Sequence, residues 1–319
     1  MFEILEAGGL VTIQDAGRHG WQKFGVPVSG PMDWFAHRAA NALAGNSSDA
    51  AALEIGFGDL ALRARHDCIV AVTGVGFVAS TYVWTFPLWT SFIVRAGWTI
   101  SITKKGAGNW AYLAVAGGIE AESTLGSRSS YLRARLGKKL EVGDSLKIGK
   151  PSRSLDELAA RTYSREKQPA YSSSPVIEVI EGSQSDSHFG SDCHFAFLNS
   201  KYAISPSSDR MGYRLEGPSI AHARGADLLS EGMVVGSIQV PANGQPIVMM
   251  ADCPTTGGYP KIANVVSADL PLLAQVPPRE GHVRFKMTSI EDAQSRYRRM
   301  IQDMEDGIED AENDAMFAQ

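Results

Sequence analysis

The chain has 319 residues, enough for two lobes, because a single hydrophobic core stops growing at about 250 to 300 residues. Hydrophobic residues make up 44% and charged residues 20%, as in an ordinary globular protein. The formal net charge of −5 argues against non-specific nucleic-acid binding, which requires Lys and Arg clustered opposite phosphate. No apolar run reaches the roughly 18 residues that a membrane helix needs.

The cysteines and the first residues favour a cytoplasmic location. Cys68, Cys193 and Cys253 are too few for a disulfide framework, which fits a reducing compartment. The N-terminus, Met-Phe-Glu-Ile-Leu-Glu, has no basic region and does not resemble a signal peptide. We therefore expect a cytoplasmic protein.

Residues 1–165 are expected to form a β-rich N-terminal lobe. Glycine and proline turns separate short β-branched or aromatic runs at the spacing of a barrel or sandwich, namely 11–14, 68–73, 91–95, 99–103 and 110–115. One helix is predicted, with Asp33 as its N-cap and Gly45 at its end. The strand–helix–strand alternation of a nucleotide-binding α/β fold is missing.

The second half of the chain is expected to form another β-rich lobe and a tail. The polar, Ser- and Pro-rich stretch 151–175 predicts a linker or an exposed excursion. The second lobe spans 176–287 and contains one predicted helix near 185–198. From Ser289, an N-cap with Asp292 three residues on, residues 288–319 are expected to form a helical acidic tail, with a frayed last dozen residues.

Two polar loops mark a candidate site in the second lobe. They are the segments 207–217 and 252–261, and each sets charged and hydroxyl side chains among glycines. Gly212, Gly257 and Gly258 would let the backbone adopt φ > 0 or approach another group closely. Polar loops joined by short strands are a common way to build a small-molecule site on a barrel. Tight turns without a ligand are the alternative.

Cations and acids in these loops suggest recognition of an anionic ligand. We expect three cations to contact a ligand carboxylate: Arg210 and Lys261 in the loops, and Arg18 outside them. The guanidinium of an Arg can bind a carboxylate in bidentate fashion. For each of the three, a surface ion pair is the alternative. Asp209 and Asp252 could act as a base or orienting acceptor beside a paired Arg, or could only cap an Asx-turn.

Other polar groups of the same region complete the predicted site. Tyr213 and Tyr259 would supply hydroxyls at a rim or form half-buried walls, and the amide of Gln239 would contact a ligand or an internal network. The catalytic candidates are Asp209, Arg210 and Lys261. The substrate-binding candidates are Tyr213, Gln239, Thr255, Thr256, Gly257, Gly258, Tyr259 and Arg18.

Several familiar motifs are absent from the chain. There is no phosphate-binding P-loop, and Gly74-Val-Gly76 lacks the rest of a dinucleotide fingerprint. His188, Cys193 and His194 lack metal-ligand spacing, so no metal site is predicted. Cys253 has no visible His partner for a nucleophilic role, and no lysine lies in a biotin-attachment motif.

A series of motifs runs in order through residues 1–286. They are Thr12-Ile-Gln-Asp-Ala-Gly-Arg18, Gly25-Val-Pro-Val-Ser-Gly-Pro-Met-Asp33, Asn41-Ala-Leu-Ala-Gly-Asn46, Ala52-Leu-Glu-Ile55, Leu113-Ala-Val-Ala-Gly-Gly-Ile119, Gly126-Ser-Arg-Ser129, Ser208-Asp-Arg-Met-Gly-Tyr-Arg-Leu-Glu-Gly217 and Thr255-Thr-Gly-Gly-Tyr-Pro-Lys-Ile-Ala263. Together they resemble the KipA-type family of biotin-dependent carboxyltransferases, also called the allophanate hydrolase subunit 2 group, which includes components of 5-oxoprolinase.

The resemblance implies two β-barrel lobes, of which at least the C-terminal one is cyclophilin-like. It also implies two partner proteins, one of the KipI type and one of the LamB/YcsF type. Such a complex opens the lactam of 5-oxoproline to glutamate with ATP hydrolysis. The chain would be inactive alone, and ATP would bind with the partner proteins. The resemblance maps the site onto Asp209, Arg210, Tyr213, Gln239 and Lys261.

Two other functions stay open at this point. The chain could be a biotin-dependent carboxyltransferase component that acts on urea or a similar amide, with carboxybiotin carried by another chain. It could also be a non-catalytic protein that binds and sequesters a KipI-type kinase inhibitor.

Overall fold

The computed structural model describes residues 1–310, which group into two compact units. The first unit holds Met1–Arg18, Ser29–Pro169 and residues 302–310 of the described chain; the second holds His19–Val28 and Ala170–Ile301. Segment 19–28 thus belongs to the second unit, although its position in the sequence placed it in the expected N-terminal lobe. Among residues 1–310, no helix is both long enough and apolar enough to cross a membrane.

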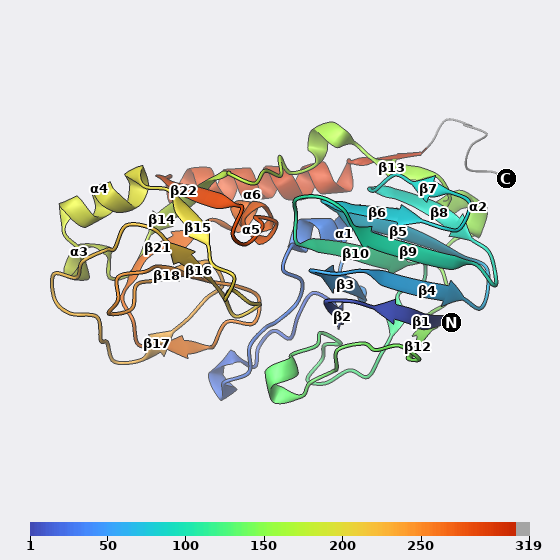
Figure 1. Cartoon of the computed structure of the whole chain (residues 1–319), viewed down its shortest axis with the longest axis horizontal. Coiled ribbons are helices and arrows are strands. Elements are labelled where there is room, and N and C mark those ends of the chain that lie inside the picture. The colour runs from blue at the N-terminus through green and yellow to red at the C-terminus, as the bar shows by residue number, and fades with distance from the viewer. Residues whose placement is uncertain (311–319) are drawn as a thin grey trace. The chain divides into compact units, whose positions relative to one another are not determined.

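The first unit is built from two antiparallel sheets (Figure 1). The first sheet has the order β11 (Ile119–Glu120), β12 (Ser145–Ile148), β1 (Phe2–Ala7), β4 (Leu60–Ala64), β9 (Thr99–Lys104), β6 (Phe77–Ser80) and β7 (Thr85–Phe86). The second has the order β2 (Leu10–Gln14), β3 (Ala52–Gly56), β10 (Trp110–Val115), β5 (Cys68–Gly74), β8 (Thr90–Val94), β13 (Arg161–Tyr163) and β23 (Ile308–Asp310).

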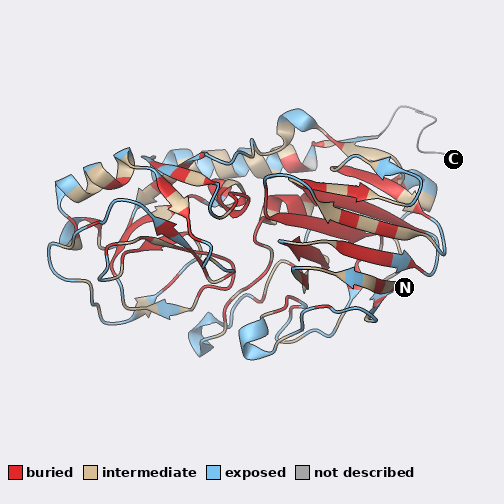
Figure 2. Ribbon diagram, in the orientation of Figure 1, coloured by how far each residue is buried: buried red, intermediate tan, exposed pale blue. Residues whose placement is uncertain are grey.

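One hydrophobic core joins the two sheets of the first unit. Ile4 and Leu62 of the first sheet and Leu53, Val72 and Leu113 of the second belong to the same buried cluster. Strands β3, β5 and β10 are buried at every residue (Figure 2). The reason is that helix α1 (Trp34–Leu43) packs on β10 and β5, so both faces of these strands are covered.

Local sequence signals place helix α1 correctly. The Asp33 side chain accepts a hydrogen bond from the backbone N–H of Ala36 at 2.9 Å, which confirms the predicted N-cap. Gly45 follows the helix with a left-handed φ of 72°.

Three expectations for the first unit need correction. Its strands form two sheets rather than a closed barrel. The expected linker contains α2 (Leu155–Leu158), strand β13 and the 3-10 turn η3 (Arg165–Lys167), and a capping box of Ser154 and Glu157 starts α2. The acidic tail is not helical throughout, because β23 pairs with β13. The rest of the expected tail, 311–319, lies outside the described residues.

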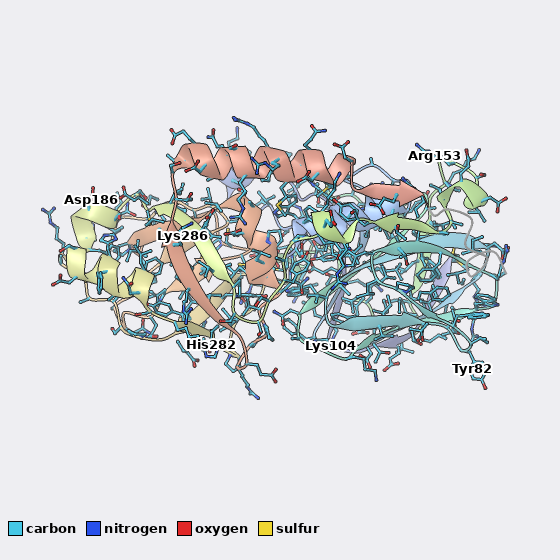
Figure 3. All side chains as sticks on the ribbon, turned by 90° about the horizontal axis from the view of Figure 1, so that it is seen from above. Tyr82, Lys104, Arg153, Asp186, His282 and Lys286 are labelled. Atoms are coloured by element: carbon cyan, nitrogen blue, oxygen red, sulfur yellow. The ribbon has the colours of Figure 1, made fainter. Side chains whose placement is uncertain are left out.

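A closed seven-stranded barrel forms the second unit and confirms the mostly-β class. Its order is β14 (Val176–Glu181), β21 (Lys261–Val265), β18 (Ser237–Gln239), β19 (Ile247–Met249), β16 (Gly212–Glu216), β15 (Tyr202–Ile204) and β22 (His282–Met287). Parallel pairing of β14 with β22 completes the ring, and the other neighbours are antiparallel. Along β22, Val283 and Phe285 are buried while Arg284 and Lys286 are exposed (Lys286 is labelled in Figure 3).

Short helices and one ribbon surround this barrel. The predicted helix near 185–198 is broken at Phe189-Gly190 into α3 (Ser185–His188) and α4 (Ser191–Asn199). Helix α5 is Leu270–Ala274, and the ribbon pairs β17 (Glu231–Gly232) with β20 (Thr256–Gly257). Helix α6 (Ile290–Glu305) follows the predicted cap, since Ser289 Oγ accepts from Asp292 N at 3.0 Å. The remaining 3-10 turns are η1 (Gln22–Phe24), η2 (Leu132–Ala134) and η4 (Ser267–Asp269).

The buried imidazole of His37 in α1 makes stability depend on pH. Burial lowers the pKa of His37 from 6.5 to about 4, and the ring contacts Gln14 O at 3.0 Å. Below pH 6.5 the unfolded chain binds a proton that the folded chain excludes, so stability falls as the pH falls towards 4. We expect a loss of about 2 to 3 kcal/mol from this residue.

Urea unfolding at pH 7.5 and 4.5 measures that loss. The variant His37→Gln should show a correspondingly smaller change between the two pH values than the wild type. His66→Gln, at an exposed position, is the matched control and should keep the full wild-type change. Equal pH dependence in the wild type and His37→Gln would contradict the assignment.

Candidate functional site

The two predicted loops are joined by a buried ion pair. Arg210 donates from Nε and Nη2 to the two carboxylate oxygens of Asp252, each at 2.9 Å. Their side chains are only 7% and 9% exposed, and the backbone N–H of Asp252 donates to Arg210 O at 2.8 Å. The guanidinium therefore already has a bidentate carboxylate partner. In this state Arg210 orients Asp252 and ties the loops together, and its charge is balanced inside the protein.

Lys261 belongs to a second polar group beside ribbon β17–β20. Its buried ammonium donates to the carboxylate of Glu231, and Gln184 Nε2 donates to the same oxygen at 2.7 Å. The hydrogen bond from Lys261 is the main influence that lowers the pKa of Glu231. Glu231 is therefore ionised at neutral pH. Its side chain is 41% exposed, so Glu231 lies at the surface while its partner Lys261 lies in the interior.

The glycines of the second loop are required for close packing. A Cβ on Gly257 would lie 2.4 Å from Met233 Cε and 2.6 Å from Gln239 Nε2, and one on Gly258 would lie 2.9 Å from Leu228 O. Neither glycine has a positive φ, and neither has Gly212. The sequence suggested two roles for these glycines, a left-handed backbone or a close approach to another group. The structure shows the close approach.

The two tyrosines of the predicted site differ in exposure. Tyr213 is 1% exposed and donates its hydroxyl to Ala274 O at 2.8 Å, so it is a wall residue of the barrel. Tyr259 is 40% exposed and lines a surface groove of about 510 Å³, together with Arg214 and Gln245. The amide of Gln239 donates to the carbonyl of Tyr259 at 3.3 Å, which is the internal network expected as one alternative.

Asp209 and the two threonines lie at the edge of this arrangement. Asp209 is exposed, and its carboxylate accepts from the backbone N–H of Met211 at 2.8 Å, as in an Asx-turn. Thr256 is exposed on ribbon strand β20, and Thr255 is half-buried just before it. Asp209 is thus next to Arg210 in the chain but lies on the exposed side of the loop.

Arg18 belongs to the first unit, where it supports a buried polar network. Its guanidinium donates to Ser129 O. Burial alone would raise the pKa of the neighbouring Asp15 carboxyl. Hydrogen bonds from Ser127, Ser129 and two backbone N–H groups outweigh burial and lower that pKa. The motifs 12–18 and 126–129 are therefore partners in one structural network.

Sequence reasoning missed three parts of the site in the second unit. Glu231 and Gln184, which hold Lys261, stand outside the motifs and loops from which the site was predicted. The third part is segment 19–28, whose residues 19, 22, 27 and 28 line a pocket of about 260 Å³ together with residues 233–235, 251 and 253–255. The only available signal was the unusual run of glycine and proline between residues 17 and 31, which predicts an irregular loop.

Cys253 faces the same pocket as a protonated thiol. Burial raises its pKa to about 12, and burial also raises the pKa of Cys68 to about 12. At pH 8 only about one part in 10⁴ of such a thiol is the reactive thiolate. We therefore expect iodoacetamide to label the less buried Cys193 in the folded chain and all three cysteines after unfolding. Mass spectrometry of the labelled peptides checks this; rapid native labelling of Cys253 would contradict it.

Comparison with known proteins places the chain in a family. The family model described as carboxyltransferase domain, subdomain A and B, matches residues 24–287. The 5-oxoprolinase C subunit of Escherichia coli is 38% identical over 300 residues, covering 92% of this chain and 93% of that protein. The 5-oxoprolinase C subunit of Haemophilus influenzae is 35% identical over 301 residues, with the same coverage.

Two solved yeast structures share the fold. The urea amidolyase of K. lactis superposes with a TM-score of 0.89 at 27% identity, over 97% of this chain and 20% of that one. The Kluyveromyces lactis urea carboxylase superposes with a TM-score of 0.87 at 26% identity, over 99% of this chain and 30% of that one. This chain thus corresponds to a minor part of either yeast protein.

The match over residues 24–287 and the two bacterial relatives confirm the resemblance expected from the ordered motifs. The chain belongs to the family of carboxyltransferase domains of subdomains A and B, and it is homologous to the C subunit of 5-oxoprolinase.

Proposed function

We propose that this chain is the C subunit of an ATP-dependent 5-oxoprolinase, which opens the lactam of 5-oxoproline to glutamate. The observation that carries the proposal is similarity over nearly the whole length of two bacterial proteins named as that component of 5-oxoprolinase, at 38% and 35% identity. In this proposal the chain works with a KipI-type partner and a LamB/YcsF-type partner, and alone it is inactive.

The polar groups of the second unit suit this chemistry. A lactam is a stable amide, so its opening requires stabilisation of negative charge on the carbonyl oxygen in the transition state. Lys261 is a buried ammonium in a fixed position, held by Glu231. Asp252, oriented by Arg210, is a fixed carboxylate that can accept a proton or a hydrogen bond. We therefore assign Lys261 and Asp252 to the reaction and Arg210 to the positioning of Asp252.

The same geometry bears on where ATP would bind. A polyphosphate needs unbalanced positive charge or a run of backbone N–H groups, as in a P-loop. Arg210 and Lys261 are each paired with a carboxylate, so this part of the chain is a poor fit for three phosphates. We therefore place ATP with the two partner proteins, and phosphoryl transfer from ATP, with release of ADP, would be the chemistry it supplies there.

Reconstitution tests the proposed function. The purified chain alone should show no 5-oxoproline-dependent ATP hydrolysis, and the mixture with the KipI-type and LamB/YcsF-type partners should show it. Glutamate and ADP should form in equal amounts in the mixture. The control omits this chain from the mixture and should be inactive. Turnover by the lone chain, or equal turnover without it, would overturn the proposal.

A second candidate is carboxyl transfer from carboxybiotin to urea or a related amide. It is favoured by the TM-scores of 0.89 and 0.87 to urea amidolyase and urea carboxylase. The biotin would be carried by another chain. The discriminating assay adds carboxylated biotin carrier and urea to this chain and measures loss of labelled carboxyl from the carrier. A tight complex with the KipI-type protein that catalyses neither reaction would instead support the sequestering role.

A further inference from the structure

The pocket of about 260 Å³ in the second unit has polar groups on two of its walls. On one wall, Gln22 Oε1 accepts a hydrogen bond from Gly20 N at 2.9 Å. This contact occupies the amide oxygen of the exposed Gln22 side chain and leaves its NH₂ group as the hydrogen-bond donor. On the other wall, the carbonyl of Thr255, which lines the pocket, accepts from Met233 N at 2.9 Å, and this contact holds the backbone there.

The rest of the lining is apolar. Met233 and Cys253 belong to one buried hydrophobic cluster of the barrel, and Pro27 and Val28 line the pocket from segment 19–28. Apolar walls with a few fixed polar groups are the usual design of a small-molecule site, in which the walls hold the ring and the polar groups set its orientation. A small ring with hydrogen-bonding edges and at most one charge matches this lining better than a ligand with several charges.

Size narrows the ligand further. Pockets for drug-sized ligands usually measure about 300 to 1,000 Å³, so a volume of about 260 Å³ suits one small ring with its substituents. A nucleotide, with its base, ribose and phosphates, is too large. The groove of about 510 Å³ that Tyr259 lines is larger, and it presents both Arg214 and Glu216, which makes it less selective for an anion.

Ribbon β17–β20 connects this pocket with the ion pair of Lys261. In the ribbon, Glu231 is paired with Gly257, and the next backbone contact along it joins Met233 to Thr255. Glu231, which holds Lys261, is thus only two residues from a pocket wall. A ligand in the pocket would touch the same short ribbon that positions the ammonium.

We infer that this pocket binds the substrate as a five-membered lactam carrying one carboxylate, with Gln22 and Thr255 as specificity-determining residues. The inference rests on the proposed function. The Gln22 amide donates to the carboxylate, and the Thr255 hydroxyl accepts from the lactam N–H. The ring lies against the apolar walls.

Two nearly isosteric variants test the inference in the reconstituted complex. Gln22→Glu keeps an oxygen that can accept from Gly20 N but replaces the donor by a negative charge. Thr255→Val removes the hydroxyl and keeps the shape. Each should raise the KM for 5-oxoproline about 10-fold or more, because a hydrogen bond to a charged or strongly polar group is lost. The KM for ATP and the melting temperature should stay near the wild-type values.

Direct binding to the isolated chain gives a second readout. Ligand-observed NMR should detect 5-oxoproline with the wild type and a weaker signal with either variant. Arg214→Ala, in the larger groove, is the matched control and should change neither KM nor the NMR signal.

Each remaining outcome overturns the inference. If the wild-type complex is active and both pocket variants keep the wild-type KM, the pocket assignment is wrong while the proposed function stands. If Arg214→Ala raises the KM instead, the substrate binds in the larger groove. If the wild-type complex does not turn over 5-oxoproline, the proposed function fails and the pocket assignment with it.

Discussion

Replacing Asp252 by alanine is expected to lower the free energy of unfolding by about 3 to 5 kcal/mol, because it leaves the Arg210 guanidinium buried without its carboxylate. Both side chains are less than a tenth exposed, so water cannot take over the lost contacts without local opening of the loops. Chemical denaturation of the isolated chain, followed by fluorescence, measures the change.

Two further variants test whether the loss of unfolding free energy comes from the broken ion pair or from any change in these loops. Asp209→Ala removes an exposed Asp next to Arg210 and should cost only about 1 kcal/mol, since water can replace the contacts that its carboxylate makes with Met211 N and Gly212 N. The double variant Arg210→Met with Asp252→Leu should recover much of the lost stability, because it removes both buried charges. An equal cost for Asp252→Ala and Asp209→Ala would show that the pair is not buried in solution.

The variant Lys261→Met is expected to lower kcat of the reconstituted complex about 100-fold or more, the usual cost of removing one group that stabilises transition-state charge. Its effect on stability should be small, about 1 kcal/mol or less. Glu231 is 41% exposed and can be hydrated when its partner is lost, and Met fills most of the space of the Lys stem. Steady-state kinetics and a melting curve for the same preparation measure both effects.

Lys286→Met is the matched control for this prediction. Lys286 lies on the same barrel, 67% exposed and 3.4 Å from Glu178, and neither residue lines the groove of Tyr259 or the pocket of Cys253 (Figure 3). It should keep wild-type kcat. In Lys261→Met, the pKa of Glu231 should rise towards the ordinary value of a Glu, because the hydrogen bond that lowers it is gone. Full activity of Lys261→Met would remove Lys261 from the reaction.

The sequence by itself determined the features that depend on neighbouring residues. Asp33 and Ser289 begin helices where their side chains predict it, since a cap needs only the next turn of backbone. Buried and exposed residues alternate along β22 because a strand has a two-residue period. The family also followed from the sequence, because the ordered motifs are a property of the chain itself. The sequence did not determine the number of sheets or whether a sheet closes into a barrel, because the same short strands can form either arrangement.

Only the tertiary structure decided which polar groups meet. Arg210 and Asp252 are 42 positions apart, and Lys261 and Glu231 are 30 apart. No local pattern encodes such pairs, because they depend on the register and closure of the barrel. The sequence therefore named Arg210 and Lys261 as cations, with an ion pair as one alternative, without determining which acid each one meets. It also placed segment 19–28 in the wrong unit, because packing and not chain order decides which core a loop joins.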